Sequence, residues 1–95
     1  MDIQEALGPL REHIDHIDNE IIALLNERVR LASEVGKIKM RQGGSIYVPS
    51  REQLIFDKLS KLNKGPIQGD AVKAIWREII SASISLEKKL VIAYL

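Results

Sequence analysis

Three basic residues of this chain, Arg28, Lys39 and Arg51, have no acidic residue three or four places before or after them. On a helix, those are the positions from which a carboxylate pairs with a cation. A guanidinium stays charged in proteins and is costly to bury unpaired, so an anion from elsewhere is expected to meet these residues. Guanidinium groups bind carboxylates through paired hydrogen bonds, which favours a small, rigid ligand with several negative charges.

Arg28 also interrupts a regular apolar pattern, which we call the heptad seam. Its members recur at steps of three and four and are Leu7, Leu10, Ile14, Ile17, Ile21, Leu24, Arg28, Leu31, Val35 and Ile38. The seam predicts one helix from about Leu7 to Lys39, roughly 50 Å long. A compact domain of this size has a radius of gyration of about 12 Å, so a second chain is expected to cover the excess length.

The position of Lys39 on this helix places it beside Arg28. It follows Arg28 by eleven residues, a rotation of about 20° and a rise of about 16 Å, so both side chains project from nearly the same face. Ala32 and Val35 lie between them and would leave an apolar floor for a ring. By contrast, Lys37 follows Glu34 by three places and is expected to form an ordinary exposed ion pair.

Arg11 is a further candidate, although it lies about 25 Å from Arg28 along the helix and about 100° off its face. Only a second chain could therefore bring it to the same small ligand. The alternative reading is structural. A single arginine in a heptad seam can equally set the register of a helix pair or meet a glutamate of a partner chain.

The rest of the chain predicts two shorter helices, from about Pro49 or Ser50 to Leu62 and from about Asp70 to Lys88. The buried side of the first is expected to include Leu54, Ile55, Leu59 and Leu62. Residues 90–95 are uncharged and β-prone, so we expect the start of a strand there, belonging to a downstream domain. The prediction is an all-α domain over residues 1–89 with one long, one short and one medium helix.

The overall composition excludes several function classes. Fourteen basic and thirteen acidic residues leave a net charge of +1, too balanced for a nucleic-acid or anionic-membrane protein with a broad basic surface. The chain has no cysteine and only two histidines, which argues against disulfides, thiolate chemistry and a histidine-rich metal site. No apolar run approaches the ~20 residues of a membrane span, and no signal peptide is recognised, so we expect a soluble cytoplasmic protein.

Several segments together closely resemble the all-helical class of chorismate mutases. They are Leu10-Arg11, Leu24 to Arg28, Glu34 to Lys39, Pro49 to Glu52 and Ser83 to Glu87. The last part of the chain, from Ile79 to Leu95, resembles the junction in bifunctional proteins in which this mutase precedes a prephenate dehydratase. The resemblance implies an interlocked homodimer that rearranges chorismate to prephenate, on the route to phenylalanine and tyrosine, without nucleophile, metal or cofactor.

The resemblance also implies roles for the unpaired cations and the residues near them. Arg28, together with Arg11 donated by the partner chain, would hold the two carboxylates of chorismate. Lys39 would reach the ether oxygen and a neighbouring carboxylate, while Arg51 would support the cationic wall. Ile80 is expected to join Ala32 and Val35 among the substrate-binding residues.

Four further positions complete the implied site. Glu52 would accept a hydrogen bond from the ring hydroxyl, and Ser83 would help position the ring carboxylate. Val48 stands where relatives often have aspartate and could contribute only its backbone. Glu87 stands where relatives often have a glutamine facing the ether oxygen, and a carboxyl group can donate a hydrogen bond there only when it is protonated.

Two other functions stay open at this level. Isochorismate-pyruvate lyases resemble the same scaffold and use a similar cationic pocket. The chain could also be a non-catalytic helical dimerisation module in which a partner acid neutralises Arg28.

Overall fold

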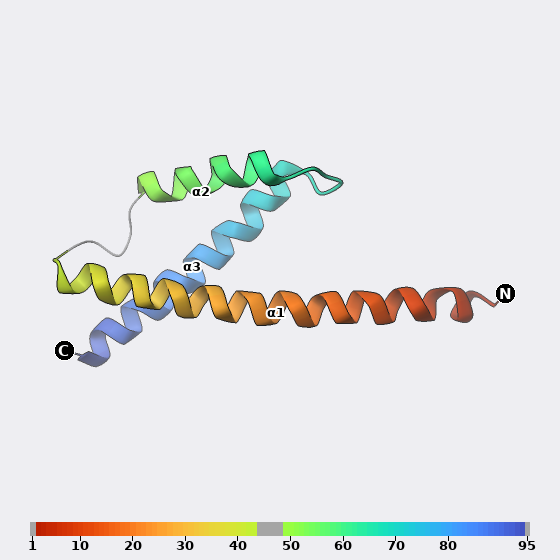
Figure 1. Cartoon of the computed structure of the whole chain (residues 1–95), viewed down its shortest axis with the longest axis horizontal. Helices are drawn as coiled ribbons and strands as arrows, with labels where there is room; N and C mark the ends of the chain where they lie inside the picture. Colours follow the sequence, from red (N-terminus) through yellow and green to blue (C-terminus); the bar gives the residue numbers. More distant parts are fainter. Residues whose placement is uncertain (1, 44–48, 95) are drawn as a thin grey trace.

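The computed structural model describes the backbone of residues 2–43 and 49–94 and the side chains of residues 2–43 and 51–89. Three helices occupy these ranges: α1 (Ile3–Arg41), α2 (Pro49–Leu62) and α3 (Gly69–Tyr94). Figure 1 shows that α3 crosses α1 and that α2 lies beside the first part of α3. No strand occurs within the described ranges, which confirms the predicted all-α class.

The long helix α1 starts earlier than the heptad seam predicts. Its first turn is closed by the backbone N–H of Ala6, which donates to the Asp2 carbonyl at 3.1 Å, and Pro9 lies inside the helix. Pro9 is in the second turn, where it lacks the N–H that would donate to the Glu5 carbonyl, so α1 continues there with one backbone hydrogen bond fewer. At the other end, Gln42 donates to the carbonyls of Ile38 and Lys39, and Gly43 adopts a φ of 74°, the left-handed conformation that commonly ends helices.

The length of α1 determines the shape of the chain. Its 39 residues span about 58 Å at the usual helical rise, and the chain measures 62 × 29 × 14 Å with a radius of gyration of 17.7 Å. This radius exceeds the value of about 12 Å for a compact domain of the same size. The prediction that one helix would extend beyond its own globule is confirmed.

A short turn joins α2 to α3. Asn63 stabilises it by donating from its side-chain amide to the Ile67 carbonyl and accepting from the Gly65 N–H, both at 2.9 Å. Gly65 has a φ of 77°, which only glycine adopts at little cost. The predicted start of the third helix is confirmed to within one residue.

The predicted strand at residues 90–95 is wrong, because α3 continues through Tyr94. Extending an existing helix by one residue gains one backbone hydrogen bond and requires only that residue to be ordered. This gain outweighs the β preference of residues 90–94. No proline interrupts the segment.

The packing centres on α3, which contacts both α1 and α2. Phe56 from α2 and Val72 from α3 are buried, and at the α1–α3 crossing Ser33 and Gly36 are buried. Small residues let two helix backbones approach closely. The expected burial of Leu54 and Leu62 is wrong: both are more than 60% exposed, because α2 turns the face that carries Phe56 toward α3.

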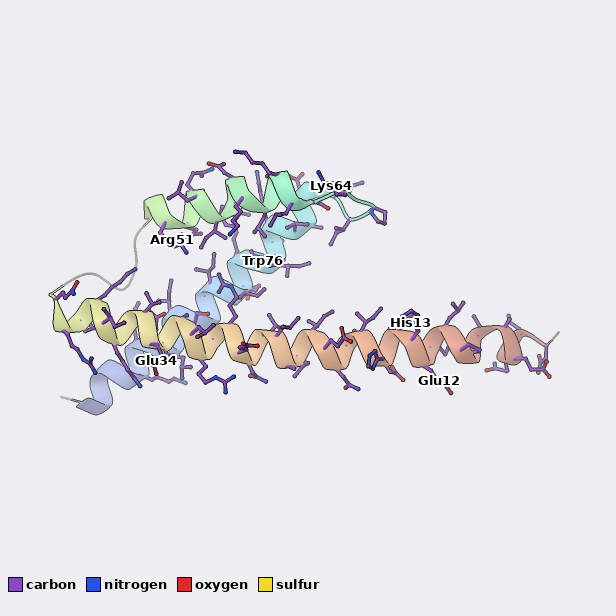
Figure 2. All side chains as sticks on the ribbon, viewed as in Figure 1. Glu12, His13, Glu34, Arg51, Lys64 and Trp76 are labelled. Carbon is purple, nitrogen blue, oxygen red and sulfur yellow. The ribbon has the colours of Figure 1, made fainter. Side chains whose placement is uncertain are left out.

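Most of the heptad seam remains uncovered in the single chain. Its members Leu10, Ile14, Ile17, Ile21, Leu24, Leu31, Val35 and Ile38 are between 42% and 63% exposed. Figure 2 shows Glu12 and His13 on a stretch of α1 that has no other helix beside it. Over the described residues, no helix combines the length and apolar character needed to cross a membrane.

Candidate active site

A cavity of about 250 Å³ lies between the three helices. From α1 it is lined by Arg28, Leu31, Ala32, Val35 and Lys39, from α2 by Arg51, Glu52 and Ile55, and from α3 by Ile80, Ser83, Ile84 and Glu87. Of the described residues that were proposed for the site from the sequence, all except Arg11 are therefore brought together. Their roles toward a substrate stay predictions.

Three cations face this cavity without an acidic partner. In residues 2–43 and 51–89, no carboxylate oxygen lies within ion-pair distance of Arg28, Lys39 or Arg51. Figure 2 shows Arg51 in the first turn of α2, on the side that faces α1. The contrasting prediction for Lys37 is confirmed, because its Nζ lies 3.5 Å from Glu34 Oε1 at the surface.

Apolar side chains separate the cations. Ala32, Val35 and Ile80 line the cavity as expected. Three further residues, Leu31, Ile55 and Ile84, also line it and were not assigned to the site from the sequence. Each lies three or four positions from a residue that was assigned, so helical periodicity carried the signal that would have found them. The cavity thus has an apolar floor and a cationic rim.

Ser83 is buried and its hydroxyl group is already engaged. Its Oγ donates to the Ile79 carbonyl of the preceding turn at 2.9 Å, and only 4% of the residue is exposed. A hydroxyl has one proton, so in this geometry Ser83 can meet a ligand only as an acceptor. Donation to a ring carboxylate, as the resemblance implies, requires the hydroxyl to turn away from Ile79.

Glu87 is the buried acid of the cavity, with 9% of the residue exposed. Burial raises the pKa of its carboxyl group above the ordinary value of 4.5, and the positive charge of Lys39 opposes this rise. Desolvation disfavours the ionised form, so Glu87 is easier to keep protonated than a glutamate in water. A protonated carboxyl is a hydrogen-bond donor, and it lies in the same cavity as three cations.

Gly36 on α1 lies directly against Glu87. A Cβ atom built at Gly36 would stand 3.1 Å from Cγ, Cδ and Oε2 of Glu87. The buried acid therefore packs where position 36 has no side chain. Sequence reasoning did not single out Gly36 as part of the site, since nothing in its neighbourhood along the chain indicates which residue of α3 it meets.

One described residue that was predicted for the site, Arg11, is not in the cavity. Arg11 is exposed on the first half of α1, about 25 Å along the helix from Arg28, so its own chain does not bring it to the cavity. Val48 lies outside the described residues. Within the described part of the chain, no group of three or more histidine, cysteine, aspartate or glutamate residues is arranged to hold a metal ion.

The fold and the cavity define an all-α, three-helix protein with a pocket lined by three cations. The sequence model of chorismate mutase type II matches residues 10–88. The chain belongs to the chorismate mutase type II family, a family of isomerases.

Individual relatives agree with this assignment. The chain is 50% identical over 95 residues to the bifunctional chorismate mutase/prephenate dehydratase of Aquifex aeolicus, covering 96% of this chain and 26% of that protein. It is 42% identical over 93 residues to the protein of the same name from Neisseria gonorrhoeae, covering 98% and 25%. The chain therefore spans about a quarter of the length of these curated relatives.

A solved structure shares the fold. The chorismate mutase (form II) of Thermus thermophilus superposes with a TM-score of 0.85 at 34% sequence identity, over 87% of this chain and 94% of that one. The three-helix arrangement is thus the fold of a protein that bears the family's name.

Proposed function

We propose that this chain is a chorismate mutase that rearranges chorismate to prephenate. The observation that carries the proposal is the cavity in which Arg28, Lys39 and Arg51 converge from two helices with no acid in ion-pair distance among the described residues. A dianion such as chorismate would supply the missing negative charges. Membership of a family of isomerases supports the same reaction class.

The size and lining of the cavity suit such a ligand. The cavity measures about 250 Å³ and is open to solvent, slightly below the range of about 300–1,000 Å³ for small-molecule pockets. We propose that the partner chain completes its wall. Its apolar floor at Ala32 and Val35 leaves room for the ring, while the cations at its rim are placed for the two carboxylates.

The reaction breaks the ether C–O bond as a C–C bond forms in one concerted step. The protein's task is to hold the enolpyruvyl arm over the ring and to stabilise the negative charge that grows on the ether oxygen. Lys39 and protonated Glu87, which approach the cavity from α1 and α3, are the proposed donors to that oxygen. Arg28, together with Arg11 of the partner subunit, is proposed to bind the two carboxylates. Arg51 is proposed to support the cationic wall, and Glu52 is the proposed acceptor for the ring hydroxyl.

The test is the loss of chorismate absorbance with purified protein. We expect turnover with the native chain, a large loss in Lys39→Ala and near-native turnover in Lys37→Ala, a matched control two residues away whose Nζ instead pairs with Glu34. A parallel assay on isochorismate separates the lyase alternative. If neither substrate is converted, the proposal fails, and failure to bind a dicarboxylate transition-state mimic would then favour a non-catalytic dimerisation module.

We further propose an intertwined homodimer in which the partner chain supplies Arg11 to each cavity. The exposed apolar seam along α1 supports this arrangement, since a continuous apolar stripe of this length is a typical interaction surface. Sedimentation at several protein concentrations tests the dimer directly. A monomer at micromolar concentration that still turns over chorismate would contradict it.

We also propose that the chain is the mutase part of a bifunctional chorismate mutase/prephenate dehydratase and that it works in the cytoplasm. The names of the two relatives support the first point, and the lack of cysteine is compatible with the second. The proposed domain boundary at residue 89 falls inside α3, which continues through Tyr94. Formation of phenylpyruvate by the full-length protein would test the fusion.

A further inference from the structure

We propose that Gly36 is a positioning residue for Glu87: the absence of a side chain at position 36 creates the space in which the Glu87 carboxyl lies and so sets where that group faces the cavity. Where it concerns catalysis, this inference rests on the proposed function. The packing itself can be tested without any substrate.

The geometry at the α1–α3 crossing supports this role. A Cβ at position 36 would lie 3.1 Å from Cγ, Cδ and Oε2 of Glu87, closer than nine in ten real Cβ contacts. The contact would include both the carboxyl carbon and one of its oxygens, so a methyl group there would act on the functional end of the side chain. Gly36 and Glu87 are both buried, so the carboxyl can yield to a Cβ at position 36 only by shifting toward the cavity that it lines.

The backbone conformation of Gly36 does not call for glycine. Its backbone lies in α1 and does not adopt the left-handed conformation found at Gly43 and Gly65. Within a helix, glycine is less favourable than alanine because it loses more backbone entropy on folding. The close approach of Glu87 is therefore the physical reason that the structure offers for a glycine here.

Displacing the carboxyl would change both its position and its titration. The charged groups that share the cavity with Glu87 are Arg28 and Lys39 from α1 and Arg51 and Glu52 from α2. A methyl group at position 36 would push the carboxyl off the surface of α1 and alter its distance to these charges and to solvent. The pKa of Glu87 and the alignment of its carboxyl group with the ether oxygen of a bound substrate should then change together.

The first experiment compares Gly36→Ala with Gly69→Ala. Gly69 also lies in a helix, and a Cβ there would meet nothing within 4 Å, so it is a matched control for the glycine-to-alanine change. We expect kcat/KM for chorismate to fall about three- to tenfold in Gly36→Ala, because the carboxyl must shift by a few tenths of an ångström and a misplacement of about 1 Å can cost about 100-fold. The control should stay within about twofold of the native protein, with the helical circular dichroism of both variants unchanged.

The second experiment needs no substrate. The carboxyl carbon of Glu87 is followed by ¹³C NMR through a pH titration of the ligand-free protein. We expect the Glu87 midpoint to move in Gly36→Ala and to stay at the native value in Gly69→Ala. A loss of activity caused only by general destabilisation would leave the midpoint of the folded protein unchanged.

The third experiment is a cycle of thermal midpoints with Glu87→Ala, which removes all three atoms that the new Cβ would contact. In the Glu87→Ala background, Gly36→Ala should raise the thermal midpoint, because only the helix preference of alanine remains. In the native background, the same substitution should raise the thermal midpoint less, or lower it. If Gly36→Ala alone does not fold, folding of the double variant supports the inference and its failure to fold overturns it.

An unchanged Glu87 midpoint together with equal thermal effects of Gly36→Ala in both backgrounds would overturn the proposal. If the native chain does not convert chorismate, the proposed function fails, but the titration and the thermal cycle still decide whether Gly36 positions Glu87.

Discussion

Lys39 on α1 and Glu87 on α3 line the same cavity without forming an ion pair. Burial raises the pKa of Glu87 by more than the charge of Lys39 lowers it, so the net effect is a raised pKa. An ion pair between them would hold Glu87 ionised and occupy Lys39. Their separation leaves the ammonium free to meet a ligand and keeps the carboxyl group easier to protonate.

Glu87 should make the activity depend on pH. If the protonated carboxyl donates to the ether oxygen, turnover of chorismate will be highest at low pH and will fall as the pH rises through the raised pKa of Glu87. Glu87→Gln supplies a donor that does not titrate, so its profile should be flat over the same range. The measurement is kcat/KM from mildly acidic to mildly basic pH. A flat profile in the native protein would refute this role.

Glu87 should also make the stability of the fold depend on pH. Its folded-state pKa lies above the ordinary value of 4.5, so the unfolded chain ionises first as the pH rises. The free energy of unfolding should therefore fall between pH 4.5 and the raised pKa and stay constant above it. Glu87→Gln should lose less stability across this window. Urea denaturation at a fixed protein concentration measures the difference, and identical pH slopes in the two proteins would contradict it.

Removal of one cation from the cavity should reduce catalysis strongly. Arg28→Ala and Lys39→Ala each delete a charge-assisted contact in a partly buried site, for which we expect a loss of about 3–4 kcal/mol of transition-state stabilisation, or about 100- to 1,000-fold in kcat/KM. Steady-state kinetics on chorismate measures the loss. Lys37→Ala serves as the control, because Lys37 pairs with Glu34 and does not line the cavity. Near-native turnover in either cavity variant would rule out the assigned role.

A mixed dimer can test whether Arg11 acts from the partner chain. Arg11→Ala and Arg28→Ala should each be nearly inactive alone. When equal amounts are mixed and refolded together, about half of the dimers contain one copy of each variant, and one of the two sites in each of these has both arginines. We therefore expect about a quarter of the native activity to return. No recovery from a mixture shown to contain mixed dimers would indicate that Arg11 does not act across the interface.

Much of this architecture follows from local patterns in the sequence. The heptad seam predicts the long helix, and the glycines at 43 and 65 lie where helices end, because periodicity and backbone preference act over a few neighbouring residues. The unpaired state of Arg28 and Lys39 is equally local, since the residues one turn away on α1 contain no acid. The side-by-side placement of these two cations follows from helix geometry alone.

Other features needed the packed chain. The exposure of Leu54 and Leu62 depends on which face of α2 meets α3. Apolar periodicity alone did not distinguish the face that carries Phe56 from the adjacent face that carries the two leucines. The helical state of residues 90–94 depends on continuation of α3, although the local composition favours a strand. Helical spacing places Leu31, Ile55 and Ile84 on the same faces as assigned site residues, but only the packing of the three helices brings these faces around one cavity.

By itself, the sequence determined the helical class, the length of α1 and the set of cations without nearby acids, because these depend on residues within one or two turns. Only the tertiary structure decided that Arg51 and Glu87 share a cavity with Arg28, and that Gly36 is where Glu87 packs. These are contacts between residues far apart along the chain, and their geometry depends on the angle and depth at which α3 crosses α1, which no local pattern encodes.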